Sequence, residues 1–160
     1  MPAVVLYDVA LAGHIAAIVV AFGVTFAYPV LVPFVQRHHP RALPAVHEGQ
    51  GRIGRFLITP AATVALVLGI YLAGDRHYFG ELWVQVPFAI LVVLLGLAGA
   101  FFAPTERRAA ELARRDVTAA GDMDVRWSAE YLAVARRLAI VGALAGLLVL
   151  VAVFFMTAKP

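Results

Sequence analysis

Four long apolar segments alternate with polar segments along the chain. They cover residues 9–35, 56–73, 82–103 and 132–156, and each is near or above the ~20 apolar residues that a helix needs to cross a bilayer. The stretch from Ile90 to Phe102 has no polar side chain, so it offers no polar face at helical spacing. The pattern predicts an all-α integral membrane four-helix bundle, with polar loops at 36–55 and 104–131.

The composition agrees with a bilayer environment. The 160 residues are 62% hydrophobic and only 14% charged, which is too little polar surface for a water-soluble globule of this size. The four spans use most of the chain, so we expect a single transmembrane domain. Cysteine is absent, which excludes disulfides, thiolate metal ligands and a cysteine nucleophile.

The basic residues predict the orientation of the bundle. All but two of the 13 Lys and Arg residues lie in the two polar loops or at the foot of the last span, and the two exceptions are Arg76 and Lys159. The positive-inside rule therefore places both loops in the cytoplasm and both termini on the outer, periplasmic or extracellular side of a plasma (inner) membrane. Basic residues beside spans favour membrane lipids as partners and argue against nucleic acid.

Several local features are expected within this frame. Pro29 and Pro33 predict a kink in the first span, or a helix that frays before Arg37. Arg107, Glu111 and neighbouring charges at i,i+4 spacing predict a helix that continues past Pro104 and ends at Gly121. We interpret it as a solvated extension of the third span in preference to a partner-docking helix.

Small residues recur at intervals of four and indicate close helix packing. They occur at Gly13, Ala17 and Ala21, at Ala61, Ala65, Gly69 and Ala73, and at Gly142 and Gly146. Such faces let helix backbones approach closely in lipid. Packing within the bundle is favoured over dimerisation, and a homo-oligomer or a membrane-complex partner remains an alternative.

His14 is the one strongly polar, titratable side chain well inside a span, about 9 Å below Asp8 at 1.5 Å per residue. Its imidazole suits a haem iron, a divalent metal or a proton-transfer role. The alternative is structural, a neutral histidine hydrogen-bonded to a carbonyl or hydroxyl on a facing helix. Candidate neighbours at the outer end are Asp8, Asp75, His77, Glu81 and Met156. From these we predict a metal site at His14, Asp75 and His77, or cofactor binding by His14 and His77.

The first polar loop carries a second group of candidates. Arg37, Arg41, Arg52 and Arg55 are predicted to contact lipid headgroups. His38, His39 and His47 could bind Zn²⁺ or Ni²⁺, but the neighbouring arginines disfavour a cation. Three glycines, Gly49, Gly51 and Gly54, are expected just before a helix N-terminus, where backbone N–H groups would attract lipid phosphate.

Short motifs over most of the chain resemble small bacterial four-span proteins related to the membrane domain of the copper-resistance D proteins. The motifs are His14 with Gly23 and Phe26, Arg52 with Arg55, Pro60 with Gly69, and the terminal Met156, Lys159 and Pro160. The resemblance implies a largely unassigned function, with copper handling or haem association as suggestions. With three Met and no Cys, the chain has few of the soft ligands that Cu(I) prefers.

The chain is also similar to the membrane-embedded protoporphyrinogen oxidases. That resemblance implies haem b held by a first-span histidine, matched by His14, and by a lysine in the bundle, whereas the only lysine here is Lys159. Two hypotheses follow. The first is a binding or accessory component without an enzymatic site of its own, with a small-ligand or metal site near His14. The alternative is a haem b oxidoreductase with His14 as axial ligand that exchanges electrons with a quinone or porphyrin. A transporter is disfavoured, because one histidine gives ion coupling little to work with.

Overall fold

A computed structural model describes residues 2–160, which contain helices and turns and no β-strand. The helices are α1 (Pro2–Phe22), α2 (Tyr28–His38), α3 (Leu43–Ile53), α4 (Thr59–Asp75), α5 (Leu82–Leu97), α6 (Ala103–Ala120) and α7 (Ala129–Ala158). Short 3₁₀ segments cover Gly23–Ala27 (η1), Pro40–Ala42 (η2) and Tyr78–Gly80 (η4). Two π-helical turns, Gly54–Ile58 (η3) and Ala98–Phe102 (η5), connect α3 to α4 and α5 to α6.

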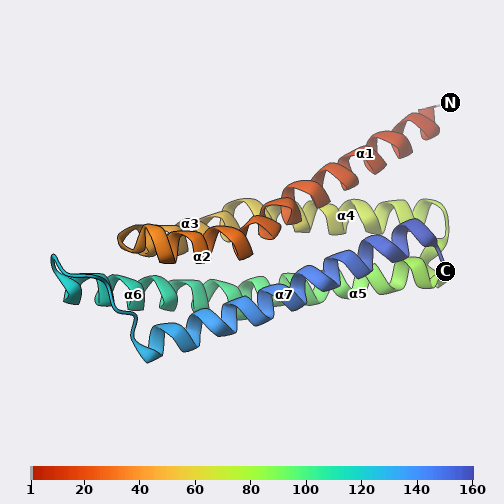
Figure 1. Cartoon of the computed structure of the whole chain (residues 1–160). Coiled ribbons are helices and arrows are strands. Elements are labelled where there is room, and N and C mark those ends of the chain that lie inside the picture. Colours follow the sequence, from red (N-terminus) through yellow and green to blue (C-terminus); the bar gives the residue numbers. More distant parts are fainter. Residues whose placement is uncertain (1) are drawn as a thin grey trace.

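The segments combine into four rods that are long and apolar enough to cross a membrane, which confirms the prediction of an all-α chain with four helices of membrane-spanning length. The rods run over Leu6–His38, Pro40–Asp75, Leu82–Ala120 and Ala129–Ala158. Both termini lie at the same end of the molecule as the turn between α4 and α5 (Figure 1). We call this the outer end and the opposite end, with the α6–α7 connection, the inner end.

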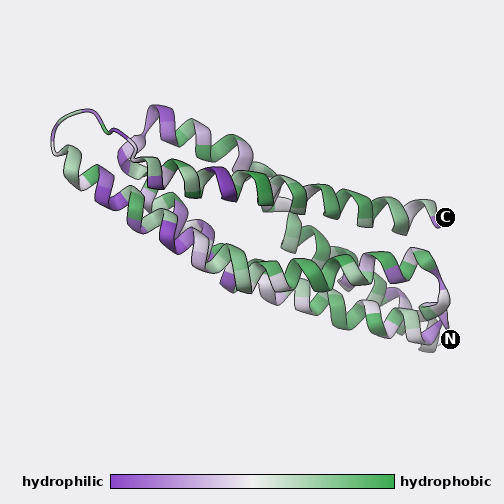
Figure 2. Cartoon of the chain, turned by 90° about the horizontal axis from the view of Figure 1, so that it is seen from below, coloured by the Kyte–Doolittle hydropathy of each residue, from purple (hydrophilic) through white to green (hydrophobic). Residues whose placement is uncertain are grey.

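Each rod is longer than the bilayer requires. They contain between 30 and 39 residues, against ~20 for a span. Figure 2 shows that hydrophobic residues dominate the half toward the termini, whereas hydrophilic residues gather toward the inner end. The bundle therefore continues past its apolar half into a polar helical head made of the end of α2, α3, α6 and the start of α7.

Most of the loop predicted at 36–55 is helical. α2 extends to His38, and α3 begins at Leu43 with Pro44 in its first turn, where the missing N–H of proline is harmless. The glycines expected before a helix N-terminus lie inside the continuous rod of α3, η3 and α4, so no helix begins there to attract phosphate. Packing accounts for this, because α3 runs along α6 and a Cβ on Gly51 would lie 3.9 Å from Cβ of Glu106.

The second polar segment contains the predicted helix. α6 ends at Ala120, and Gly121 follows with φ +55° and ψ −121°, a positive-φ conformation that glycine adopts without steric cost and that cannot continue the helix. The prediction of a solvated extension holds only for the exposed face of α6. Its other face buries Ala109, Leu112 and Ala113 in a core shared with Tyr131 of α7.

The first span kinks where proline predicts it. The α-helix gives way to the 3₁₀ segment η1 just before Pro29, and Figure 1 shows α1 and α2 bending apart at this point. The predicted close packing of small residues is also present between α1 and α4, where Ala17, Ala21 and Ala65 are buried together.

In the apolar half the helices pack mainly in two pairs, and a groove remains between α7 and the first rod. α1 packs mainly on α4, and α7 packs mainly on α5. The glycine face of α7 lies in no tight interface at Gly142, because a Cβ added there meets nothing within 4 Å. Gly142 and Gly146 instead line an apolar groove of about 240 Å³ against Thr25, Phe26 and Pro29.

Candidate functional site

His14 lies on α1 and faces α4. Its Nδ1 is 2.7 Å from the carbonyl oxygen of Ala65. A carbonyl only accepts hydrogen bonds, so Nδ1 carries the hydrogen and donates it. In the neutral imidazole the other nitrogen, Nε2, then holds a free lone pair. The structural interpretation of His14 is therefore correct for one ring nitrogen and leaves the second available.

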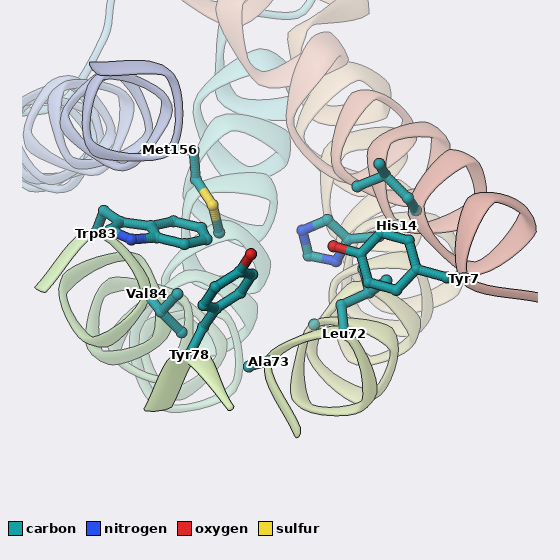
Figure 3. A pocket seen from close by; sticks show the side chains of 10 residues that line it. Tyr7, His14, Leu72, Ala73, Tyr78, Trp83, Val84 and Met156 are labelled. Atoms are coloured by element: carbon teal, nitrogen blue, oxygen red, sulfur yellow. The ribbon is translucent and has the colours of Figure 1, made fainter. Parts of the chain in front are cut away.

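The ring of His14 borders a cavity of about 90 Å³ at the outer end of the bundle. Its lining residues come from α1, α4, η4, α5 and α7, and they are Tyr7, Leu11, His14, Gly69, Leu72, Ala73, Tyr78, Trp83, Val84 and Met156. Figure 3 shows the imidazole pointing into the space between the α1–α4 wall and the α5–α7 wall. The lining is apolar and aromatic apart from the imidazole, the two tyrosine hydroxyls and the indole N–H of Trp83.

Gly69 allows the imidazole of His14 to lie close to the backbone of α4. A Cβ on Gly69 would lie 3.1 Å from Cε1 and 3.4 Å from Nδ1 of His14, closer than side chains normally approach. The small residue on α4 therefore makes room for the ring beside the backbone.

The structure does not gather the predicted metal ligands. Within residues 2–160, no group of three or more His, Asp or Glu residues is placed to hold a metal ion. His77 is exposed in the turn after α4 with φ 59°, Asp75 pairs with Arg76, and neither lines the cavity with His14. The prediction of a metal site at His14, Asp75 and His77 thus has no support from the geometry.

Haem does not fit the cavity as it stands. Met156 faces His14 from the opposite wall (Figure 3), and histidine with methionine is a known pair of haem ligands. However, the cavity of about 90 Å³ is smaller than the ~150 Å³ apolar cavity that holds a single benzene ring. A four-pyrrole macrocycle would require the two walls to separate.

A second polar group is buried in the inner head. Nδ1 of His47 on α3 is 2.9 Å from Oε2 of Glu106 on α6, and Nε2 is 3.1 Å from the hydroxyl of Tyr131 on α7. His47 is 2% exposed and Tyr131 is fully buried. Near them, Tyr28 Oη and Gln50 Oε1 are buried without a hydrogen-bond partner among the described residues. We call His47, Glu106 and Tyr131 the inner network.

The inner network joins three helices and borders neither described cavity. The three histidines that are close together in the sequence lie in different environments in the structure. His47 is buried, whereas His38 and His39 are exposed and contact Phe34. The two hydrogen bonds of His47 connect α3 to α6 and to α7.

Asp116 of α6 fixes the start of α7. Its Oδ2 accepts hydrogen bonds of 2.8 Å from both the backbone N–H and the hydroxyl of Ser128, and the Ser128 hydroxyl oxygen accepts one from the N–H of Tyr131. Burial raises the pKa of the Asp116 carboxyl, but the hydrogen bonds from Ser128 and Arg115 lower it more, so the pKa lies below 3.8.

The four arginines predicted to contact lipid headgroups are all exposed. Arg37 lies at the end of α2, and Arg52 and Arg55 lie along the rod of α3 and α4. Arg41 donates a hydrogen bond to the Met123 carbonyl oxygen in the α6–α7 connection. Their exposure leaves the guanidinium groups accessible to lipid.

Of the other cavity residues, the sequence indicated Met156 as a candidate neighbour of His14 but did not assign Tyr7, Tyr78 or Trp83 to the site. Tyr7, Tyr78 and Trp83 mark outer helix ends, which explains them as membrane-interface residues. Their position at the same end of the predicted bundle as His14 was the available signal. The inner network had no signal of this kind, because His47 and Glu106 lie 59 positions apart in segments that read as polar loops.

No known protein family, curated protein or solved structure matches the chain significantly. The four helices that are long and apolar enough to cross a membrane are compatible with a multi-pass membrane protein. Its main polar feature within the apolar half is one imidazole at an aromatic cavity.

Proposed function

We propose that this chain is a membrane protein that binds a small molecule. The cavity beside His14 holds this ligand, which is largely apolar and has one hydrogen-bond donor. The observation that carries the proposal is the free lone pair of His14 Nε2, which follows from the bond between Nδ1 and Ala65. An acceptor in a mostly apolar and aromatic lining favours a ligand that donates one hydrogen bond, because a buried polar group without a partner costs about 1–3 kcal/mol.

The size and walls of the cavity narrow the ligand class. At about 90 Å³ the cavity is smaller than the ~150 Å³ that holds one benzene ring, so even a single ring requires a small outward movement of the walls and nothing larger than one ring is favoured. Tyr7, Tyr78 and Trp83 provide ring faces and edges for aromatic contacts. A hydroxylated single ring satisfies both conditions.

Binding is favoured over catalysis by the chemistry of the lining. His14 is the only histidine among the ten lining residues, and no carboxylate accompanies it. General acid–base catalysis relies on groups positioned to exchange protons with the substrate, commonly in pairs. The cavity offers a site for recognition and no second acid or base beyond the tyrosine hydroxyls.

Fluorescence of Trp83 tests the proposal directly. The chain has two tryptophans, and Trp127 lies at the inner end, so Trp127→Phe leaves Trp83 as the reporter. In mild detergent, phenol should bind and change this fluorescence, whereas anisole, its methyl ether without a donor, should bind at least about tenfold more weakly. Equal affinities for the two would refute the role of His14 Nε2.

Variants of His14 provide the matched test. His14→Leu should remove the preference for phenol over anisole, and His14→Gln, which keeps an acceptor, should retain part of it. An absorption spectrum of the same purified protein, oxidised and reduced, examines the haem alternative. A Soret band lost in His14→Leu would overturn the proposal in favour of a haem protein, with cavity walls that open around the macrocycle.

We propose further that the outer end faces the periplasm or cell exterior and the inner head faces the cytoplasm, with the exposed arginines at the headgroups. The distribution of basic residues supports this orientation. Because the chain has no cysteine, single cysteines can be introduced without background labelling. In intact cells, a membrane-impermeant maleimide should label Gly80→Cys at the outer turn and should label Asp122→Cys only after permeabilisation. The reverse pattern would overturn the orientation.

A further inference from the structure

Both basic residues of the outer end lie on aromatic walls of the His14 cavity. Cζ of Arg76 is 4.5 Å from the ring centroid of Tyr7, and Nζ of Lys159 is 4.8 Å from the ring centroid of Trp83. These distances are within the ~6 Å range of cation–π contacts. Tyr7 and Trp83 stand on opposite sides of the cavity (Figure 3), so one positive charge is held near each side.

Arg76 and Lys159 are held in place without a strong ion pair. Arg76 is half exposed and its Nε is 3.6 Å from Oδ2 of the half-exposed Asp75, an ion pair that is weak in water. Lys159 makes no ion pair among residues 2–160. Ring faces attract a cation yet carry no net charge, so the positive field at the cavity remains available to an anion.

The remaining charges of the outer end do not compete inside the cavity. The carboxylates there are Asp8, Asp75 and Glu81; all three are exposed, and none lines the cavity. Arg76 and Lys159 do not line the cavity either, but each contacts the ring of a residue that does, and the imidazole of His14 borders the cavity.

From this arrangement we propose that the ligand is an organic anion, a single hydroxylated ring that carries one acid group. The inference rests on the proposed function and names its substrate class. The acid group lies at the rim near Arg76 and Lys159, the ring lies between the aromatic walls, and the hydroxyl donates to His14 Nε2.

Two isosteric probes isolate the charge. 4-Hydroxybenzoate carries the acid group, and 4-hydroxybenzamide has nearly the same shape and no charge. With Trp83 as the reporter in the Trp127→Phe protein, the anion should bind about tenfold more tightly than the amide at low salt. This ratio should shrink as the ionic strength rises toward 1 M, where screening acts over about 3 Å.

Charge variants assign the effect to the two cations. Arg76→Gln and Lys159→Gln should each lower the ratio about threefold, as expected for an exposed charge. Lys159→Arg should preserve it. Arg52→Gln, which removes a charge at the inner end, should leave the ratio unchanged and serves as the matched control for net charge.

The outcomes separate the two proposals. If both probes bind equally while phenol still binds better than anisole, the anion inference is overturned and the proposed function stands. If the anion is preferred but the ratio survives in both Gln variants, Arg76 and Lys159 are not its cause and the inference also fails. If neither the probes nor phenol binds, both proposals fail.

Discussion

Replacing His47 by Leu tests whether the inner network connects the helices of the head. In the folded protein His47 is 2% exposed and bridges Glu106 at 2.9 Å and Tyr131 at 3.1 Å. Leucine has a similar volume and makes neither hydrogen bond. The substitution leaves an unpaired hydroxyl on the fully buried Tyr131 and an unpaired carboxyl on Glu106, whose side chain is 12% exposed.

The size of the effect follows from these two orphaned groups. An unpaired buried hydroxyl costs about 1–3 kcal/mol, and the lost hydrogen bond to a carboxylate about 1.5–3 kcal/mol. Glu106 can turn partly toward water, so we expect a loss of about 3 kcal/mol, at the low end of the range for breaking a buried pair.

The free energy of unfolding is the quantity to measure. A reversible titration with sodium dodecyl sulfate in mixed micelles, followed by far-UV circular dichroism, provides it for each variant. His38→Leu is the matched control, because His38 is exposed on α2 and bonds only to the Phe34 carbonyl within its own helix. Its effect should stay within about 0.5 kcal/mol.

Full apolar replacement provides the decisive comparison. A triple variant, His47→Leu with Glu106→Leu and Tyr131→Phe, leaves no orphaned group of the network. It should recover most of the stability that His47→Leu loses, because replacing a whole buried polar group by apolar residues is often neutral or stabilising. A triple variant less stable than the single one would refute the reasoning from orphaned groups, and a loss below about 1 kcal/mol in His47→Leu would refute the connecting role.

Two further predictions concern the start of α7 and the imidazole of His14. The pKa of Asp116 is lowered in the folded state. The carboxylate therefore stabilises the fold above about pH 4, and this stabilisation is lost as the pH falls through the pKa of the folded protein. In unfolding titrations, Asp116→Asn should cost about 1 kcal/mol at pH 7, and the variant should lose this acid dependence. Stability of the variant that still falls with the same acid profile would contradict the assignment. Gly69→Ala forces a Cβ to within 3.1 Å of His14 and should weaken phenol binding and destabilise by about 1–3 kcal/mol, whereas Gly142→Ala, with nothing within 4 Å, should be neutral or stabilising by up to about 1 kcal/mol. Equal effects of the two substitutions would show that steric contact with His14 is not the cause.

Local sequence signals predicted the parts of this fold that depend on local physics. Hydropathy over about 20 residues identifies a span, because each span must satisfy its own backbone hydrogen bonds in lipid. The same holds for the kink before Pro29 and for the end of α6 at Gly121, where a residue's own backbone conformation decides the outcome. The structure contains each of these features.

Hydropathy did not predict the helical structure of the polar segments between the spans. The segment 36–55 reads as a loop because it is polar and rich in Gly and Pro, yet α3 forms there. Its stability comes from packing on α6, with Gly51 beside Glu106, and contacts between distant segments leave no mark on local composition.

The sequence by itself determined four apolar helices, a strongly basic inner end and a lone histidine in the first span. Only the tertiary structure decided what surrounds that histidine. The cavity walls come from α1, α4, α5 and α7, and the Ala65 carbonyl that fixes the imidazole hydrogen lies 51 residues from His14. The burial of His47 was decided in the same way. Apolar periodicity specifies which residues enter the bilayer or the core, whereas the pairing of polar groups depends on which helices become neighbours, and that choice is made by packing.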